Sequence, residues 1–355
     1  MKRGLSTLRW VSGVARAPVR VALRRASRGP RRATWEFRTE LTREIVAQTL
    51  RAMIDVGPDW GRRLQRRRGA MIRSKRVEFS ELGFGRGGVV ARHRSRPDDG
   101  PVVFFTHGGG YVIGDPEMYR GVMAKLISSG GVAYAPRMAL APEHPYPSCL
   151  EEAEAAYRWV AERVDPSRLV VAGDSAGGGL ALALCRRMLE TGGPVPRAAF
   201  LMSPWVDPYF EGDIENYRSI DILDPRFTDY CRAQVATPER RDDPYLVPRA
   251  DIHAELPPLL VHDGDADTLH TQIRRYVVDA RSAGIDVEYE TFPDMFHVFQ
   301  IALGAVPEAS DSLRRAARWL RERVEADDET DDETDEARPD RSSRPGRSRL
   351  ANGAR

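Results

Sequence analysis

The stretch LVVAGDSAGGGLALALCRRMLE, residues 169–190, joins an apolar run to a helix-like segment through a turn of small residues. The apolar run predicts a strand that is buried on both faces. Gly173-Asp174-Ser175-Ala176-Gly177 matches the pattern G-x-S-x-G at the point where strand gives way to helix. A serine on so sharp a turn needs small neighbours, so Ser175 is a candidate nucleophile. The alternative is a glycine-rich turn that holds a phosphate or only packs closely.

Apolar runs and helix-like stretches alternate along much of the chain. Strand-like runs lie at residues 101–106, 132–137, 198–205, 257–265 and 287–293, and helix-like stretches lie at 116–129, 149–164, 268–283 and 308–325. This alternation predicts a mostly parallel, doubly wound sheet of the α/β class. Residues 206–256 break the alternation, which favours an insertion that folds over the site.

A second group of small residues, His107-Gly108-Gly109-Gly110, follows the run at 101–106. Acyl transfer needs backbone N–H groups aimed at an oxyanion, and glycines let the backbone approach the substrate closely. We expect donors from Gly108 or Gly109 and from Ala176, at the start of the helix after the serine. His107 is expected to be structural, because glycine amides can supply the donors.

The partners of a catalytic serine are expected in the order serine, acid, histidine. His297 follows the last strand-like run, where it can face the serine. Asp263, Asp265 and Asp267 follow the run before it, and all three compete to orient the imidazole. Buried carboxylates this close repel one another, which favours a single one against the histidine.

In this order, the motifs resemble those of the hormone-sensitive-lipase-like group of bacterial esterases. The resemblance covers residues 77–322 and rests on HGGG (107–110), LAPEHPYP (140–147), GDSAGG (173–178), SPW (203–205), GDADTL (264–269) and His297. It implies an α/β-hydrolase fold with a helical cap, and a serine carboxylic-ester hydrolase that works through an acyl-enzyme.

Site residues follow from the resemblance position by position. It implies that Ser175 is the nucleophile, Asp267 the acid and His297 the base. The oxyanion donors it implies are Gly108, Gly109 and Ala176, while Asp174 and Glu143 match residues that usually support the nucleophile turn. No metal and no organic cofactor is implied. Lactone hydrolases, amidases or deacetylases and acyltransferases use the same triad and remain alternatives, as does a non-catalytic ligand-binding protein.

The resemblance also predicts a cap. Residues 33–76 read as helical, with an apolar stripe at Phe37, Leu41, Ile45 and Leu50 that needs a surface to cover. Together with the insertion at 206–256, this segment is expected to cover the serine, and the aromatic residues available to line the pocket are Trp205, Tyr209, Phe210, Tyr217 and Phe227. A capped pocket predicts a small-molecule ester substrate with a short to medium acyl chain.

The two ends of the chain carry opposite charges, and the net charge of +2 gives no reason to expect nucleic acid. Residues 1–32 are rich in arginine and are either a disordered basic arm or an amphipathic helix that contacts a membrane peripherally. The charged tail at 323–355 is expected to be disordered. Three cysteines without a CxxC pattern favour unpaired thiols in a reducing compartment. The sequence has no apolar run long enough for a membrane-spanning helix, so we expect the protein in the cytoplasm. The number of subunits stays open.

Overall fold

A computed structural model describes residues 2–96, 99–210 and 220–325. Eight strands form one sheet in the order β1-β2-β4-β3-β5-β6-β7-β8. Strand β2 is antiparallel to both of its neighbours, and every other pair is parallel. The strands are β1 (Val77–Glu81), β2 (Gly88–His93), β3 (Val102–Thr106), β4 (Val132–Pro136), β5 (Leu169–Asp174), β6 (Ala199–Met202), β7 (Leu259–Gly264) and β8 (Val287–Phe292). The predicted mostly parallel sheet is therefore confirmed.

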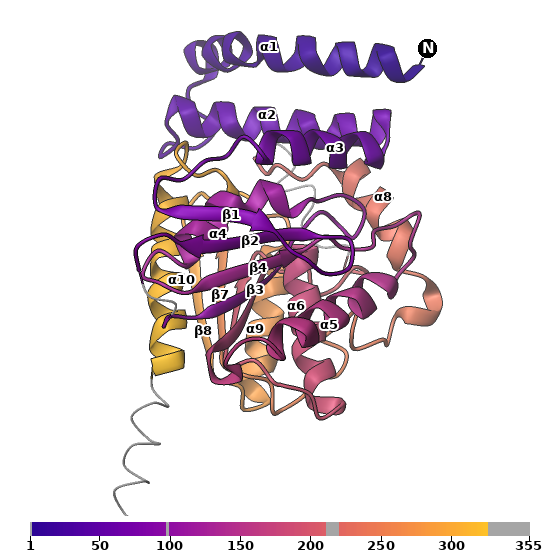
Figure 1. The fold of residues 1–355 in the computed structure, drawn as a ribbon. Helices are drawn as coiled ribbons and strands as arrows, with labels where there is room; N and C mark the ends of the chain where they lie inside the picture. Colours follow the sequence, from indigo (N-terminus) through magenta and orange to yellow (C-terminus); the bar gives the residue numbers. More distant parts are fainter. Residues whose placement is uncertain (1, 97–98, 211–219, 326–355) are drawn as a thin grey trace, which may run out of the picture.

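Helices cover both faces of the sheet (Figure 1). Side chains from α5, α6 and α9 pack on one face, and side chains from α4 and α10 pack on the other. These helices are α4 (Arg120–Leu126), α5 (Ser148–Ala161), α6 (Ala176–Glu190), α9 (His270–Ser282) and α10 (Pro307–Glu325), and short 3-10 turns are η1 (Pro116–Tyr119), η2 (Pro166–Arg168), η3 (Pro238–Arg240) and η4 (Phe299–Ile301). Every residue of β3 and β5 is buried, as the continuous apolar runs predicted.

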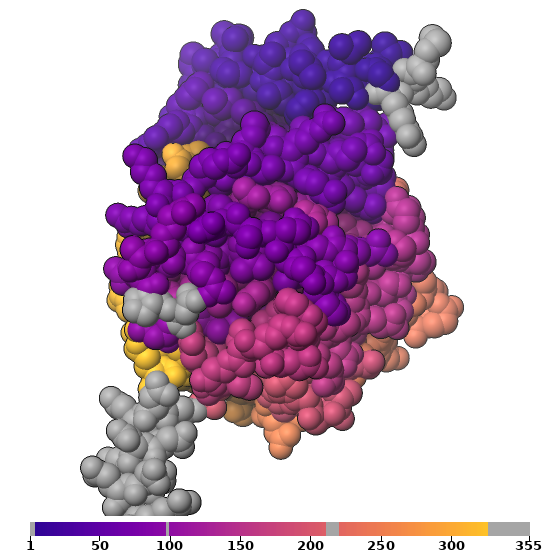
Figure 2. All heavy atoms as spheres, in the orientation of Figure 1, coloured from indigo at the N-terminus to yellow at the C-terminus, as the bar shows by residue number. Residues whose placement is uncertain are grey.

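Two further layers lie over one end of the α/β domain (Figures 1 and 2). The inner layer consists of α2 (Phe37–Val56) and α3 (Pro58–Gly69), which contact α8 (Pro225–Val235) and η1 respectively. Gly57 separates α2 from α3, because its φ of 115° suits glycine and Pro58 then starts the next helix. The helical interpretation of residues 33–76 is thus confirmed for 37–56 and 58–69.

The outer layer is α1 (Lys2–Arg28), which packs along α2. Ala17 and Val21 are buried at this contact, and the Trp10 ring stands edge-on to Trp60 at 5.2 Å between centroids. The described part of the basic arm is therefore a packed helix, and the disordered alternative is wrong there. The tail expected to be disordered lies outside the described residues from 326 onward, while residues 323–325 complete α10.

Candidate active site

Ser175 sits on the turn between β5 and α6 with backbone angles φ 52° and ψ −124°, a conformation that L-residues rarely adopt. Two backbone hydrogen bonds hold the turn: the Ser175 N–H donates to the Met202 carbonyl at 2.9 Å, and the Trp205 N–H donates to the Ser175 carbonyl at 2.8 Å. A side chain at Gly177 would collide with the Thr106 carbonyl oxygen. The strained turn thus requires the small residues that the sequence places around the serine.

Ser175, His297 and Asp267 form one hydrogen-bonded chain. The Ser175 Oγ lies 2.9 Å from His297 Nε2, and His297 Nδ1 lies 3.0 Å and 3.1 Å from the two carboxylate oxygens of Asp267. Because a carboxylate only accepts, the Nδ1–H donates to Asp267 and Nε2 is left to accept the serine proton. Both His297 and Asp267 are buried.

The two carboxylates that compete with Asp267 have other partners. Asp263 pairs with His270 Nδ1 at 2.7 Å and accepts from the Tyr289 hydroxyl at 3.0 Å. Asp265 accepts from the Asp294 N–H at 2.6 Å. Asp263 is as fully buried as Asp267, so burial alone does not select the acid. The selection follows from direction, since only Asp267 among these three contacts the imidazole.

Burial of the His297 imidazole opposes its protonated form, but nearby carboxylates outweigh burial. Asp267 has the largest opposing effect, followed by Asp221 and Asp174, and together they raise the pKa of His297 above its usual value. The site therefore favours the imidazolium form of His297.

The loop at 107–110 differs from expectation at Gly108. Its N–H already donates to Asp174 Oδ1 at 2.7 Å, so it is not free to bind an oxyanion in this conformation. Within the described part of the chain, no hydrogen bond engages the N–H groups of Gly109, Gly110 and Ala176. Asp174, which also accepts from the Tyr119 hydroxyl at 2.9 Å, ties the glycine loop to the nucleophile turn.

Glu143 and His107 are placed outside the reacting groups. Glu143 accepts from Arg62 of α3 at 2.9 Å rather than from a residue of the nucleophile turn, which differs from the implied support of that turn. Arg62 also donates to the carbonyls of Val112 and Ala141, so this contact docks α3. The buried His107 ring stacks near Tyr119, and burial lowers its pKa.

Asp221 is the residue that sequence reasoning missed. It lies in the segment before α8 and is fully buried, and its carboxylate accepts the backbone N–H of His297 at 2.8 Å. Its spacing from His297 follows no recognisable pattern, because the contact spans 76 positions along the chain. An acidic residue in an insertion is by itself too common a feature to single out.

An apolar cavity of about 380 Å³ opens above Ser175 and His297. Its wall combines α2, α3, α8 and the loop after β8, with apolar side chains from Ile45, Val46, Leu50, Met53, Leu64, Phe227, Phe296, Ile301 and Leu303. Of the aromatic residues expected to line it, Trp205 and Phe227 do so. Tyr209 and Phe210 instead line a separate surface hollow, and Tyr217 is outside the described residues.

In the part of the chain that the structure describes, no group of three or more His, Cys, Asp or Glu side chains is arranged to hold a metal ion. Over the same residues, no helix combines the length and apolar character needed to cross a membrane.

Known proteins share both the sequence pattern and the fold. The α/β-hydrolase-fold family matches residues 103–301. An acetyl-hydrolase from Streptomyces hygroscopicus is 34% identical over 68% of this chain and 85% of its own length. The esterase LipI from Mycobacterium tuberculosis is 33% identical over 63% of this chain and 73% of its own. The crystal structure of an esterase from the bacterial hormone-sensitive lipase family superposes with a TM-score of 0.71 and 30% identity, covering 79% of this chain and 98% of that one.

The fold and the site define a serine ester hydrolase. The chain belongs to the α/β-hydrolase family, within the hormone-sensitive-lipase-like group of bacterial esterases.

Proposed function

We propose that the protein hydrolyses small carboxylic esters through an acyl-enzyme on Ser175. The hydrogen-bonded chain from Ser175 through His297 to Asp267 carries this proposal. His297 accepts the serine proton during attack on the ester carbonyl and then returns it to the leaving alcohol. Asp267 fixes the imidazole tautomer and stabilises the imidazolium. The same base next activates the water that releases the acid.

The developing oxyanion is proposed to bind the N–H groups of Gly109 and Ala176, with Gly110 in place of Gly108. This choice rests on the Gly108 N–H being bound to Asp174. One such donor contributes about 3–4 kcal/mol to transition-state stabilisation. It stabilises the transition state more than the bound ester, because the negative charge on the carbonyl oxygen develops only as the tetrahedral intermediate forms.

The cavity supports short to medium acyl chains as substrates. Its apolar wall favours each added methylene by about 0.8 kcal/mol, or about fourfold in rate, until the space is full. Helices α2 and α3 close the cavity on one side, so a long chain has to displace them. The names acetyl-hydrolase and esterase on the relatives agree with small acyl groups.

A panel of 4-nitrophenyl esters of increasing chain length tests this function. We expect rates to rise with chain length to an optimum and then fall, and we expect Ser175→Ala to lose at least about 10³-fold in kcat while keeping its fold. A fluorophosphonate probe should label Ser175 in the wild type alone. Hydrolysis retained by Ser175→Ala would contradict the proposed nucleophile, and a rate still rising at long chains would contradict the bounded pocket.

We also propose that α1 carries the enzyme onto the surface of an anionic membrane in the cytoplasm. Its outer face exposes apolar side chains at near-helical spacing, Leu5, Leu8, Val11, Val19 and Leu23, each between 51% and 67% exposed. The exposed Arg9 and Arg16 border this row and complement anionic headgroups. The three buried free cysteines fit a reducing compartment.

Sedimentation with phosphatidylcholine vesicles, with and without phosphatidylserine, tests the membrane contact. We expect the full chain to sediment with the anionic vesicles and the double variant Leu8→Glu with Val19→Glu to stay in solution, with ester hydrolysis unchanged. Val278→Glu, on the exposed face of α9, is the matched control and should sediment like the wild type. Equal sedimentation of all three proteins would rule out α1 as the contact.

A further inference from the structure

One buried carboxylate joins the loops that carry the catalytic acid and base. Asp221 Oδ1 accepts from the backbone N–H of His297 at 2.8 Å and from that of Ile222 at 2.6 Å. Asp221 Oδ2 accepts from the Thr268 N–H at 2.8 Å and from the Thr268 hydroxyl. Thr268 directly follows Asp267, the proposed acid. Asp221 therefore binds the residue next to the acid and also binds His297, the proposed base.

We propose that Asp221 is a positioning residue for the triad, through which the cap holds the imidazole of His297 against Asp267. The inference rests on the proposed roles of these two residues. The inserted segment at 220–235 belongs to the cap, yet it supplies the acceptor for the N–H of the base. The catalytic geometry therefore forms completely only when the cap is seated.

The hydrogen bonds around Asp221 define its charge. Three of its four donors are backbone N–H groups, which cannot accept a proton, so the carboxylate is best satisfied as an anion. Charged groups that act on this anion are His297 and Arg43, which favour it, and Asp267, which opposes it. Burial and Asp267 raise the pKa of Asp221 overall, although its hydrogen-bond donors and His297 oppose this effect. The anionic form is inferred from the donors that surround the carboxylate.

The negative charge of Asp221 also affects the protonation of His297. His297 faces three acids, Asp267, Asp221 and Asp174, and all three stabilise its protonated form. Asp221 thus acts on His297 in two ways, by fixing its backbone and by favouring the imidazolium. A residue that served only to fold the cap would do neither.

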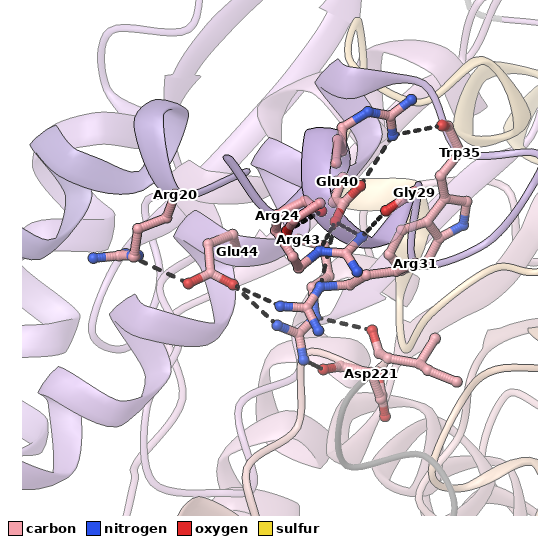
Figure 3. A network of polar contacts seen from close by, with 12 residues as sticks. Arg20, Arg24, Gly29, Arg31, Trp35, Glu40, Arg43, Glu44 and Asp221 are labelled. Carbon is pink, nitrogen blue, oxygen red and sulfur yellow. Dashed lines mark hydrogen bonds and ion pairs between the residues drawn. The ribbon is translucent and has the colours of Figure 1, made fainter. Parts of the chain in front are cut away.

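Arg43 of helix α2 binds the backbone at Asp221 (Figure 3). Arg43 is buried and donates to the carbonyls of Ile220, at 2.9 Å, and of Asp221. Glu44 lies 3.2 Å from Arg43 and 3.6 Å from Arg31, which places Arg43 within an ionic network that extends toward α1. Burial lowers the pKa of Arg43 to about 10, so it remains charged at neutral pH.

Kinetics of Asp221→Asn test the inference, with Asp224→Asn as the matched control. Asp224 is also in the cap segment, but it caps α8 and pairs with Arg51. We expect Asp221→Asn to lower kcat about 10- to 100-fold with little change in KM. Its acid limb of kcat/KM should move to lower pH by about 0.5–1 unit, because the imidazolium loses one stabilising anion. Asp224→Asn should keep both kcat and the limb.

A second variant covers the case in which Asp221→Asn does not fold. Arg43→Gln leaves the carboxylate and its four hydrogen bonds in place but removes the link to α2, so kcat should fall about 3- to 10-fold without a shift of the acid limb. Fluorophosphonate labelling of Ser175 in the wild type tests the proposed nucleophile separately. If Ser175 is labelled and folded Asp221→Asn keeps the wild-type kcat or the wild-type acid limb, Asp221 does not position the triad. If Asp221→Asn does not fold, wild-type kcat in Arg43→Gln would contradict positioning of the triad through the cap.

Discussion

At the scale of single residues, the site depends on backbone conformations that residues other than glycine rarely adopt. Ser175 and Val298 both have positive φ, of 52° and 48°, and a β-branched residue is especially unfavourable there. Each is held by hydrogen bonds from other elements, for example from the Val298 N–H to the Ser203 hydroxyl at 3.1 Å. The surrounding fold therefore stabilises conformations that the local sequence disfavours, and these conformations place Ser175 and His297.

The role of Asp267 is tested by Asp267→Asn. An amide in this position cannot hold the imidazole in the tautomer that accepts the serine proton, so kcat should fall by about 10³- to 10⁴-fold. Asp265→Asn is the control, because an amide oxygen can still accept from the Asp294 N–H, and its kcat should stay within about twofold of the wild type. A greater loss of kcat in Asp265→Asn than in Asp267→Asn would mean that Asp267 is not the acid. Rates on a saturating 4-nitrophenyl ester decide between the two.

At the scale of elements, α2 has two different surfaces. One surface packs under α1, and the other, with Ile45 and Leu50, forms part of the cavity wall. The expected apolar stripe thus divides: Ile45 and Leu50 line the cavity, whereas Phe37 is 39% exposed and lies outside its wall. Helical periodicity predicted that α2 covers something apolar, but it did not show how much of the stripe faces substrate.

The chain-length preference should respond to bulk on this wall. Ile45→Phe reduces the space for the acyl chain, so the optimum should move to shorter esters while acetate hydrolysis changes little. Each methylene excluded lowers the rate by about fourfold, from about 0.8 kcal/mol. Leu41→Phe, on the same helix but away from the cavity, should leave the profile unchanged. The panel of 4-nitrophenyl esters measures both, and matching profiles for the two variants would place the acyl chain elsewhere.

At the scale of the whole molecule, the N-terminal helix is joined to the rest through a buried acid. Glu40 of α2 is fully buried and pairs with Arg24 and Arg25 of α1 and with Arg31 beyond it. A buried charge needs such partners, since an unpaired one costs several kcal/mol. This network explains why a segment with ten basic residues and no acidic residue over positions 2–35 packs against the protein.

Removing the arginines that pair with Glu40 should lower the stability of the protein. The double variant Arg24→Met with Arg25→Met leaves Glu40 buried beside Arg31 alone, and we expect the free energy of unfolding to fall by about 3 kcal/mol. Arg28→Met, on the exposed side of the same helix, should change it by less than about 0.5 kcal/mol. Urea unfolding followed by circular dichroism gives both values. An unchanged midpoint for the double variant would mean that α1 contributes little to stability.

The local sequence determined the nucleophile turn, the alternation of strands and helices, and the order of Ser175 and His297. These features depend on sterics and hydrophobic period over a few neighbouring residues, which a single chain segment encodes. The resemblance then selected Asp267 among three carboxylates, and the hydrogen bonds to His297 agree with that selection.

Only the tertiary structure decided that Gly108 is bound to Asp174, that the outer face of α1 is apolar and exposed, and that Asp221 reaches His297. Each depends on partners distant in sequence, and Arg43 lies 178 positions from the Asp221 carbonyl that it binds. A buried polar group is satisfied by whichever donor the fold brings to it, and no local pattern records that donor.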